Sequence, residues 1–236
     1  MQLVINDVDI TKRANYISDN RLECHCRWGV IPQNYEVKLS FLDENGQERA
    51  AQTARFKTVF YDDFTAGNIN WINVQDWIFR DNYMEGTSSN GKQPSSIEFM
   101  HYVRGDIGIQ FDAMIMPGHT GGIGVFFNSF YEVVIGDNSD RMLRIYKNRK
   151  LLELSRLKIP LVTNTIYSIK IERITRASNI QNSSQEAVIS VYIDDRLVAT
   201  VVDPTPLDDN YPILGMRVWN SKVQIHNFMV YYPEEN

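Results

Sequence analysis

The sequence predicts an all-β protein whose strands form a sandwich or a barrel. Runs that alternate apolar and polar residues, or that are rich in β-branched and aromatic residues, recur along the chain. No window sustains a 3.6-residue apolar period for more than about two turns, so helices are not expected. Dipeptides that favour tight turns separate the runs, among them Asn45-Gly46 and Asp194-Asp195. Many short strands joined by such turns are typical of sandwiches and barrels.

The expected strands follow one another in chain order. Early in the chain, the polar turn at Asn45-Gly46 joins a strand at Tyr35–Leu42 to one at Thr53–Phe60, which predicts a long hairpin. The other runs with a strand pattern are Leu3–Ile5, Leu22–Trp28, Ile97–Val103, Ile107–Met116, Ile123–Phe127, Tyr131–Ile135, Leu143–Tyr146, Ile166–Ile174, Val188–Ile193, Leu197–Val202, Ile213–Trp219 and Val223–Tyr232. Gly121-Gly122 and Asn220-Ser221 are expected as turns between them.

We expect a domain boundary near residues 56–63, with a short β segment at 1–58 and a larger domain at 59–236. The hairpin before the boundary resembles the last strands of a fibronectin type III-like module, with a Tyr-centred strand, a polar turn and a final strand that leads to Phe-x-Thr. A complete module needs about 90–100 residues. The alternative, that this segment adds strands to the larger domain, therefore stays open. The larger domain is long enough for one two-sheet jelly roll.

Charge and hydropathy exclude two classes of partner. The formal net charge is −5, and Lys and Arg are scattered, so no nucleic acid is expected to bind. The densest basic run, Arg141–Arg149, alternates with Leu143, Ile145 and Tyr146, as in a strand with one solvated face. No apolar run reaches the roughly 18 residues that cross a bilayer, so no membrane partner is expected. No signal peptide is visible, which predicts a cytoplasmic location or a portion of a larger protein.

A series of motifs in the larger domain resembles a known fold. They are Tyr61-Asp62-Asp63-Phe64 followed by Trp71 and Asp76-Trp77, the strand Gly108–Met116, the Gly-rich strand Gly121–Phe127, Ile193–Val198, and the closing pair Leu214–Trp219 and Val223–Val230. In this order they resemble the concanavalin A-like lectin and glucanase superfamily, in particular laminin G-like and 3-keto-glycoside hydrolase-like domains. The resemblance implies a concanavalin A-like jelly-roll sandwich. It leaves function open, because this fold hosts enzymes, lectins and passive spacers.

The carboxylate pattern of a glycosidase is absent from the sequence. Laminarinase-like relatives cleave with Glu-x-Asp-x-x-Glu on one strand, and no Glu of this chain has Asp at the second following position. No catalytic residue is therefore assigned. One alternative stays open, a divergent glycosidase of the keto-glycoside type that uses Glu132 or Asp112 with His119. Another is a structural domain whose outer face meets a second protein chain.

Alternation along the strands predicts which residues could bind a sugar. Proteins hold sugars with an aromatic face and with planar polar groups, and the period of two puts such residues on the outer face. We expect stacking on Trp219 or Phe126. The outward polar residues expected to bind hydroxyl groups are Arg217, Asn128, Asp112, Gln110 and Glu132. The alternative is that a neighbouring segment of the chain covers Trp219, which then has a structural role. Trp71 and Trp77 are expected to plug the edge of the sandwich.

The leading functional hypothesis is a non-catalytic carbohydrate-binding or accessory module associated with a glycoside hydrolase. Its expected ligand is an oligosaccharide or polysaccharide, and its expected protein partners are other domains of a larger glycoside hydrolase. No cofactor is expected other than a structural calcium ion. Related sandwiches hold calcium near the first and last strands, where Asp62 and Asp63 would supply oxygen ligands.

Overall fold

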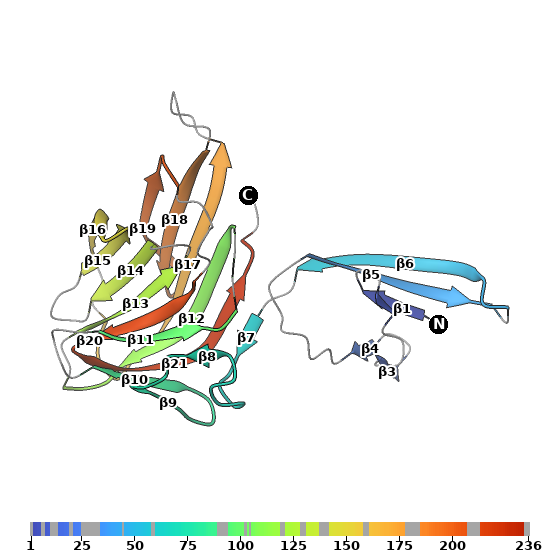
Figure 1. Ribbon diagram of the computed structural model, residues 1–236, viewed down its shortest axis with the longest axis horizontal. Helices are drawn as coiled ribbons and strands as arrows, with labels where there is room; N and C mark the ends of the chain where they lie inside the picture. Colours follow the sequence, from blue (N-terminus) through green and yellow to red (C-terminus); the bar gives the residue numbers. More distant parts are fainter. Residues whose placement is uncertain are drawn as a thin grey trace. The chain divides into compact units, whose positions relative to one another are not determined.

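The computed structural model of the chain is built from antiparallel β-sheets (Figure 1). It describes residues 2–5, 8–9, 14–18, 21–24, 34–43, 45–57, 60–88, 94–101, 103, 105–118, 121–127, 131–136, 142–157, 161–177, 185–206 and 213–233. Within these ranges no helix is long and apolar enough to cross a membrane. The chain divides into two compact units, Met1–Phe60 and Tyr61–Asn236. The all-β prediction is confirmed.

The first unit contains the predicted hairpin. Its described strands are β1 (Gln2–Ile5), β2 (Val8–Asp9), β3 (Ala14–Ser18), β4 (Arg21–Cys24), β5 (Asn34–Leu42) and β6 (Glu48–Lys57). They form a sheet in the order β2-β1-β5-β6 and a separate β3-β4 pair. The β5–β6 turn is closed by Asp43, whose Oδ1 accepts hydrogen bonds from the backbone N–H groups of Asn45 and Gln47, each at 2.9 Å. The likeness to a fibronectin type III-like module stays a prediction, and residues 25–28 of the expected strand Leu22–Trp28 lie outside the described ranges.

The second unit is a sandwich of two antiparallel sheets. Its described strands are β7 (Phe60–Asp62), β8 (Trp71–Ile72), β9 (Trp77–Phe79), β10 (Met84–Ser88), β11 (Ser95–Phe99), β12 (Ile107–Ile115), β13 (Gly122–Phe127), β14 (Tyr131–Gly136), β15 (Met142–Lys147), β16 (Lys150–Arg156), β17 (Ile166–Ala177), β18 (Gln185–Ile193), β19 (Arg196–Asp203), β20 (Gly215–Trp219) and β21 (Ser221–Tyr231). One sheet has the order β19-β18-β17-β12-β21-β10-β9, with β7 beside β21. The other has the order β16-β15-β14-β13-β20-β11-β8.

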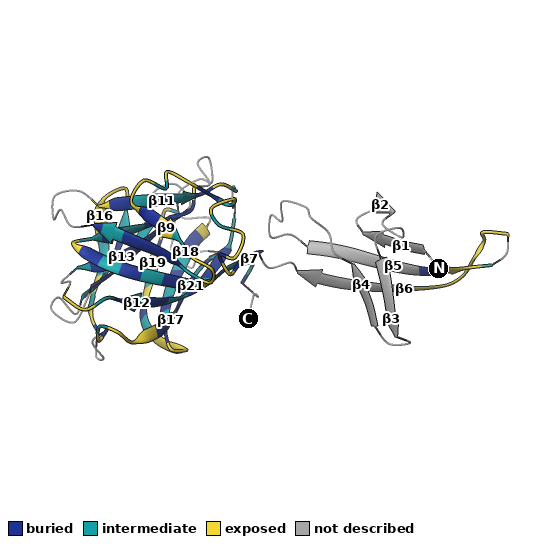
Figure 2. Ribbon diagram, turned by 90° about the horizontal axis from the view of Figure 1, so that it is seen from below, coloured by how far each residue is buried: buried dark blue, intermediate teal, exposed yellow. Residues whose placement is uncertain are grey.

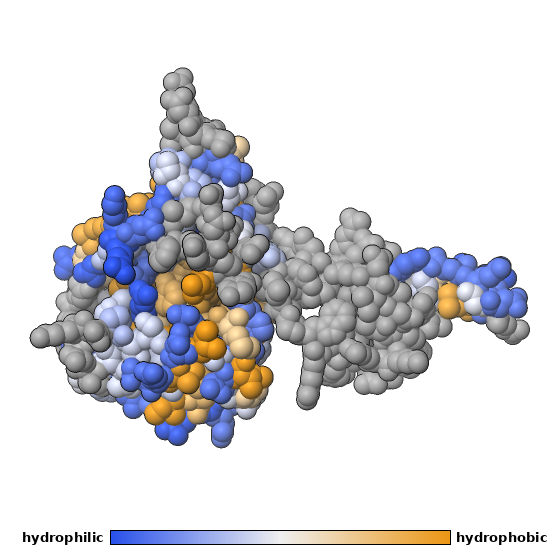
Figure 3. All heavy atoms as spheres, viewed as in Figure 1, coloured by the Kyte–Doolittle hydropathy of each residue, from blue (hydrophilic) through white to orange (hydrophobic). Residues whose placement is uncertain are grey.

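The core lies between the two sheets, as the burial colouring of the strands shows (Figure 2). Burial alternates along the central strands as the sequence predicts. On β12, for example, Ile109 and Phe111 are fully buried while Gln110 is only partly covered. Apolar side chains that point inward from both sheets give the main stabilising contribution, because their burial removes apolar surface from water. On the face of the second unit that Figure 3 displays, hydrophobic and hydrophilic residues are interspersed.

Two tryptophans close the edge of the sandwich, as predicted. Trp71 and Trp77 are 3% and 4% exposed. The Trp71 ring contacts Phe228 edge-on, with 4.9 Å between the ring centroids. The Trp77 ring lies over Gly86, where a Cβ atom would come within 2.7 Å of the indole. The glycine therefore makes room for a large ring on the neighbouring strand.

A polar cluster joins the two sheets. Asp203 at the end of β19 is 2% exposed. Its carboxylate accepts a hydrogen bond from the Tyr131 hydroxyl of β14, and Lys147 Nζ of β15 lies 2.8 Å from its Oδ2. Burial acts to raise the pKa of Asp203, but hydrogen bonds from Lys147, Tyr131 and the Thr205 backbone outweigh it and hold this pKa below the ordinary value. Asp203 is therefore charged in the folded protein at neutral pH.

The structure corrects several expected boundaries. The strand expected at Ile97–Val103 ends at Phe99, and Gly122, expected in a turn, is the first residue of β13. The β16 strand was not predicted from the sequence. It follows a turn whose residues Asn148 and Arg149 have φ of 49° and 64°. The Asp194-Asp195 turn is confirmed between β18 and β19, with φ of 49° and 60°, as a type I′ hairpin requires.

Candidate functional site

Trp219 lies on the outer face of the β13–β20 pair. It is the last residue of β20, and alternation buries Met216 and Val218 while Trp219 points outward. The ring extends over Gly124 of β13, where a Cβ atom would lie only 2.4 Å from the indole Cη2. The Cη2–Cζ3 edge of the indole is thus held close to the β13 backbone. Among the described residues the indole N–H has no hydrogen-bond acceptor.

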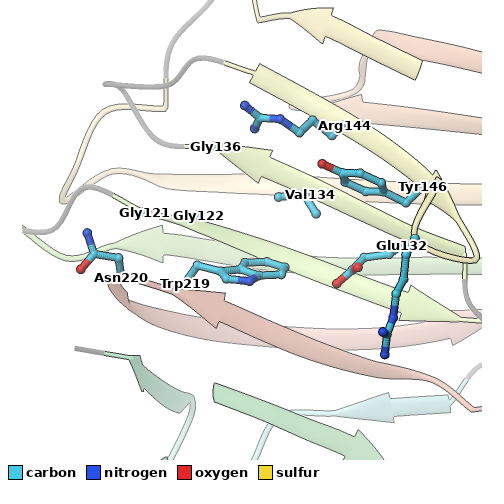
Figure 4. Close-up of a pocket in the computed structure, with 10 residues that line it drawn as sticks. Gly121, Gly122, Glu132, Val134, Gly136, Arg144, Tyr146, Trp219 and Asn220 are labelled. Atoms are coloured by element: carbon cyan, nitrogen blue, oxygen red, sulfur yellow. The ribbon is translucent and has the colours of Figure 1, made fainter. Parts of the chain in front are cut away.

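Trp219 forms one wall of a surface hollow of about 420 Å³ (Figure 4). Glycines lower the surface beside the ring, since Gly121, Gly122 and Gly136 line the hollow and carry no side chain. Gly122 and Gly136 are direct partners in the β13–β14 register. The other residues that line the hollow are Glu132, Val134, Arg144, Tyr146, Arg149 and Asn220. A hollow of this volume is in the range of small-ligand sites.

Polar side chains approach the hollow from two directions. In the register of β14 and β15, Glu132 is the partner of Tyr146, and Arg144 lies on the same face of β15. The β15–β16 turn adds Arg149, and the β20–β21 turn adds Asn220. Among the described residues the Tyr146 hydroxyl has no hydrogen-bond partner. The hollow therefore combines an aromatic face with hydrogen-bonding groups of several kinds.

Arg217 orients Glu132 beside this hollow. Its Nη1 donates to Glu132 Oε1 at 3.0 Å, and its Nε donates to Ser96 Oγ at 3.2 Å. The guanidinium also lies over the Phe126 ring, 4.5 Å from the centroid. The Phe126 ring in turn reaches Gly215, where a Cβ atom would lie 2.2 Å from its Cζ. Arg217 therefore covers one face of the Phe126 ring, whereas Trp219 lines the hollow and Phe126 does not.

Gln110 and Asp112 do not join the other predicted residues. They lie on β12, which belongs to the second sheet of the sandwich, so their outward side chains point to the opposite side of the unit. Asp112 Oδ2 accepts a hydrogen bond from Asn227 Nδ2 at 2.8 Å, and Asn227 Oδ1 accepts one from the Tyr61 hydroxyl at 2.7 Å. Gln110 Nε2 donates to Ser168 Oγ at 3.4 Å. The expected single site is therefore wrong for these two residues.

The catalytic alternative stays a prediction. It uses Glu132 or Asp112 with His119, and His119 lies outside the described ranges. Glu132 and Asp112 lie on opposite faces of the sandwich, so they do not share one site. Asn128 of the predicted binding set also lies outside the described ranges.

Asp62 and Asp63 have structural partners within the protein. Asp62 is 5% exposed, and its carboxylate accepts hydrogen bonds from the Phe64 N–H at 2.8 Å, the Asn70 amide at 3.1 Å and the Trp71 indole N–H at 2.9 Å. Asp63 is exposed and bonds within its own turn. Among the described residues, no group of three or more His, Cys, Asp or Glu could hold a metal ion. The calcium ion stays a prediction, without a donor set at this position.

Sequence reasoning missed the half of the hollow that β15 and the β15–β16 turn supply. The sequence pattern groups Tyr146 with the apolar residues Leu143 and Ile145, whereas the structure places Tyr146 beside Arg144 in the lining of the hollow. Their approach to Trp219 follows from the β13–β14–β15 pairing, which the alternation does not specify. The sequence predicts Gly122 in a turn, so its position on β13 in the lining of the hollow was not expected.

Two packed antiparallel sheets with this strand order define the class of the second unit. It has the concanavalin A-like jelly-roll sandwich fold that the sequence resemblance implied. No protein-family model matches the chain, and no curated protein is similar to it.

Solved structures are similar to the chain in fold. A carbohydrate-binding module from Bacillus subtilis is 18% identical, with a TM-score of 0.53, and the match covers 70% of this chain and 97% of that one. A sialidase is 11% identical, with a TM-score of 0.53, and the match covers 85% of this chain and 21% of the sialidase chain. At these identities the similarity establishes the fold.

Proposed function

We propose that the second unit is a carbohydrate-binding module that holds an oligosaccharide or polysaccharide against Trp219 without cleaving it. The observation that carries the proposal is the Trp219 indole, which extends to Gly124 and forms one wall of the hollow. Sugar rings present C–H groups on their faces and hydroxyls at their edges. An aromatic face ringed by hydrogen-bonding side chains is complementary to both.

The residues of the hollow have different roles in the proposed binding. Trp219 stacks on the sugar ring, and its N–H and the Tyr146 hydroxyl are available to sugar hydroxyls. Glu132, fixed by Arg217 at 3.0 Å, accepts hydrogen bonds from hydroxyls with its second oxygen. Because these groups come from paired strands, little ordering is needed when a ligand binds.

An accessory role beside a glycoside hydrolase is part of the proposal. A carbohydrate-binding module is among the proteins of similar fold, and the match to a sialidase covers 21% of that longer chain. Both are consistent with a module that keeps an enzyme near its polysaccharide. The cytoplasmic location stays a prediction.

A glycan array followed by calorimetry with Trp219→Ala tests the proposal. Loss of the stacking face should weaken binding by about 2 kcal/mol, roughly 30-fold. The affinity of Trp219→Phe, which keeps an aromatic face, should lie between those of the parent protein and Trp219→Ala. Tyr192→Ala is the matched control, because it removes an outward aromatic ring from β18 in the other sheet. Unchanged affinity in Trp219→Ala, or the absence of any bound glycan, would refute the proposal.

A further inference from the structure

Among the described residues that line the hollow, the charged side chains are two arginines and one glutamate. Glu132 is its one acidic group among the described residues, and this carboxylate is paired with Arg217 just beside the hollow. Arg144 and Arg149 add two guanidinium groups to the lining. The whole chain has a formal net charge of −5, so this local excess of positive charge does not follow from the overall composition.

We infer that the saccharide held in this hollow carries an anionic group, a carboxylate or a sulfate ester, that is bound by Arg149 and Arg144. The inference rests on the proposed function and names its ligand class. A guanidinium group donates hydrogen bonds and accepts none, and its planar fork matches two oxygens of a carboxylate or sulfate.

The balance of donors and acceptors points the same way. The two arginines and the Trp219 indole N–H only donate, Glu132 only accepts, and Tyr146 and Asn220 do both. The hydroxyls of a neutral sugar both donate and accept, and a site rich in pure donors leaves their hydrogens without partners. An anionic group supplies acceptors alone, so it complements this lining better than a neutral sugar does.

The strand order leaves room for a sugar ring between the aromatic face and the arginines. The Trp219 indole covers β13, and Arg144 lies on β15, two strands away. Adjacent strands are about 4.8 Å apart, so this separation is about 10 Å. The anionic group of a ring stacked on Trp219, or of the next ring in the chain, falls within reach of a long arginine side chain.

Matched pairs of ligands separate this inference from the proposed function. The probes are trigalacturonate and its full methyl ester, which keeps the ring hydroxyls but loses the charge, and a sulfated oligosaccharide with its desulfated form. Calorimetry on the full chain should show an affinity at least tenfold higher for one or both charged members. This preference should shrink as salt rises from 0.05 to 0.5 M, because salt screens exposed charges.

Arginine variants then locate the anion. Arg149→Gln and Arg144→Gln should each weaken binding of the charged ligand about tenfold, with little effect on its neutral partner. Arg149→Lys, which keeps the charge without the planar fork, should restore part of the loss. Arg80→Gln is the control, an identical charge change at an exposed residue that follows β9 in the other sheet. Each variant is first checked for an unchanged melting temperature.

The possible outcomes are distinct. Equal binding of charged and neutral members, lost in Trp219→Ala, would overturn the anionic ligand and leave the carbohydrate proposal standing. If Arg80→Gln weakens binding as much as Arg149→Gln and Arg144→Gln do, the anionic ligand is also overturned and the carbohydrate proposal stands. Failure of every array glycan and every probe to bind would refute both.

Discussion

Gly124→Ala should remove saccharide binding while the fold persists. The new Cβ would lie 2.4 Å from Cη2 and 2.6 Å from Cζ3 of Trp219, whereas carbon atoms in contact need about 3.5 Å. The indole must therefore lift by about 1 Å or rotate off the sheet. Such overpacking costs about 1–3 kcal/mol, equivalent to a fall in melting temperature of about 2–12 °C for a unit of this size. Because the stacking face is displaced, affinity should fall at least tenfold.

Gly86→Ala provides the matched control for this experiment. Its Cβ would lie 2.7 Å from the Trp77 indole, so it places the same strain on a Trp–Gly contact in the other sheet. Calorimetry with a glycan that the parent protein binds, together with thermal unfolding, measures both effects. Gly86→Ala should lose stability and keep its affinity. The reasoning is refuted if Gly124→Ala binds as the parent does, or if both variants lose affinity equally.

Three further outcomes follow from the polar contacts. Asp203→Asn should lower the free energy of unfolding at pH 7 by about 3 kcal/mol. In the parent, the folded-state pKa of Asp203 lies below its ordinary value of 3.8, so its contribution is present above that pH and is lost as pH falls through the folded-state pKa. Urea unfolding at pH 3 and pH 7 should show a smaller difference in the variant, and an equal difference would contradict this role. Asp62→Ala should cost about 2–4 kcal/mol in urea unfolding, because the buried Trp71 N–H loses its acceptor; a cost near zero would show that the contact is dispensable. Arg217→Met should weaken glycan binding by about 1 kcal/mol in calorimetry, since Glu132 loses its orienting partner and the aromatic face remains; a loss as large as that of Trp219→Ala would instead give Arg217 a direct role.

Local alternation in the sequence was enough to predict which side chains point outward. Phe126, Glu132, Arg217 and Trp219 all lie on the outer face, as the period of two requires. The fold class followed from the same pattern and from the tight turns. These features depend on neighbours along the chain, which a sequence displays directly.

The composition of the site could not be predicted in the same way. Alternation separates inward from outward residues but does not say which of two sheets a strand joins, and so Asp112 was grouped with residues of the other face. Pairing between β13 and β20, which are far apart in sequence, decides that grouping. The contact of Arg217 with the Phe126 ring joins residues far apart in the chain, and the hydrogen bond from the Trp71 indole to Asp62 depends on how the segment between these two residues folds. A side-chain type alone does not reveal them.

The glycines that line the hollow, Gly121 and Gly122 among them, limit which positions of the site can change between related proteins. A Cβ atom at Gly121 would overlap the Trp219 carbonyl oxygen, and one at Gly122 would lie 2.5 Å from the Ile135 carbonyl oxygen. Both obstacles are backbone atoms, so neither position tolerates a larger residue without moving a strand. Val134 and Tyr146 already carry side chains that line the hollow. Under the proposed function, related sequences should therefore keep these glycines and vary such lining side chains, which would change the ligand while the depth of the site stays constant.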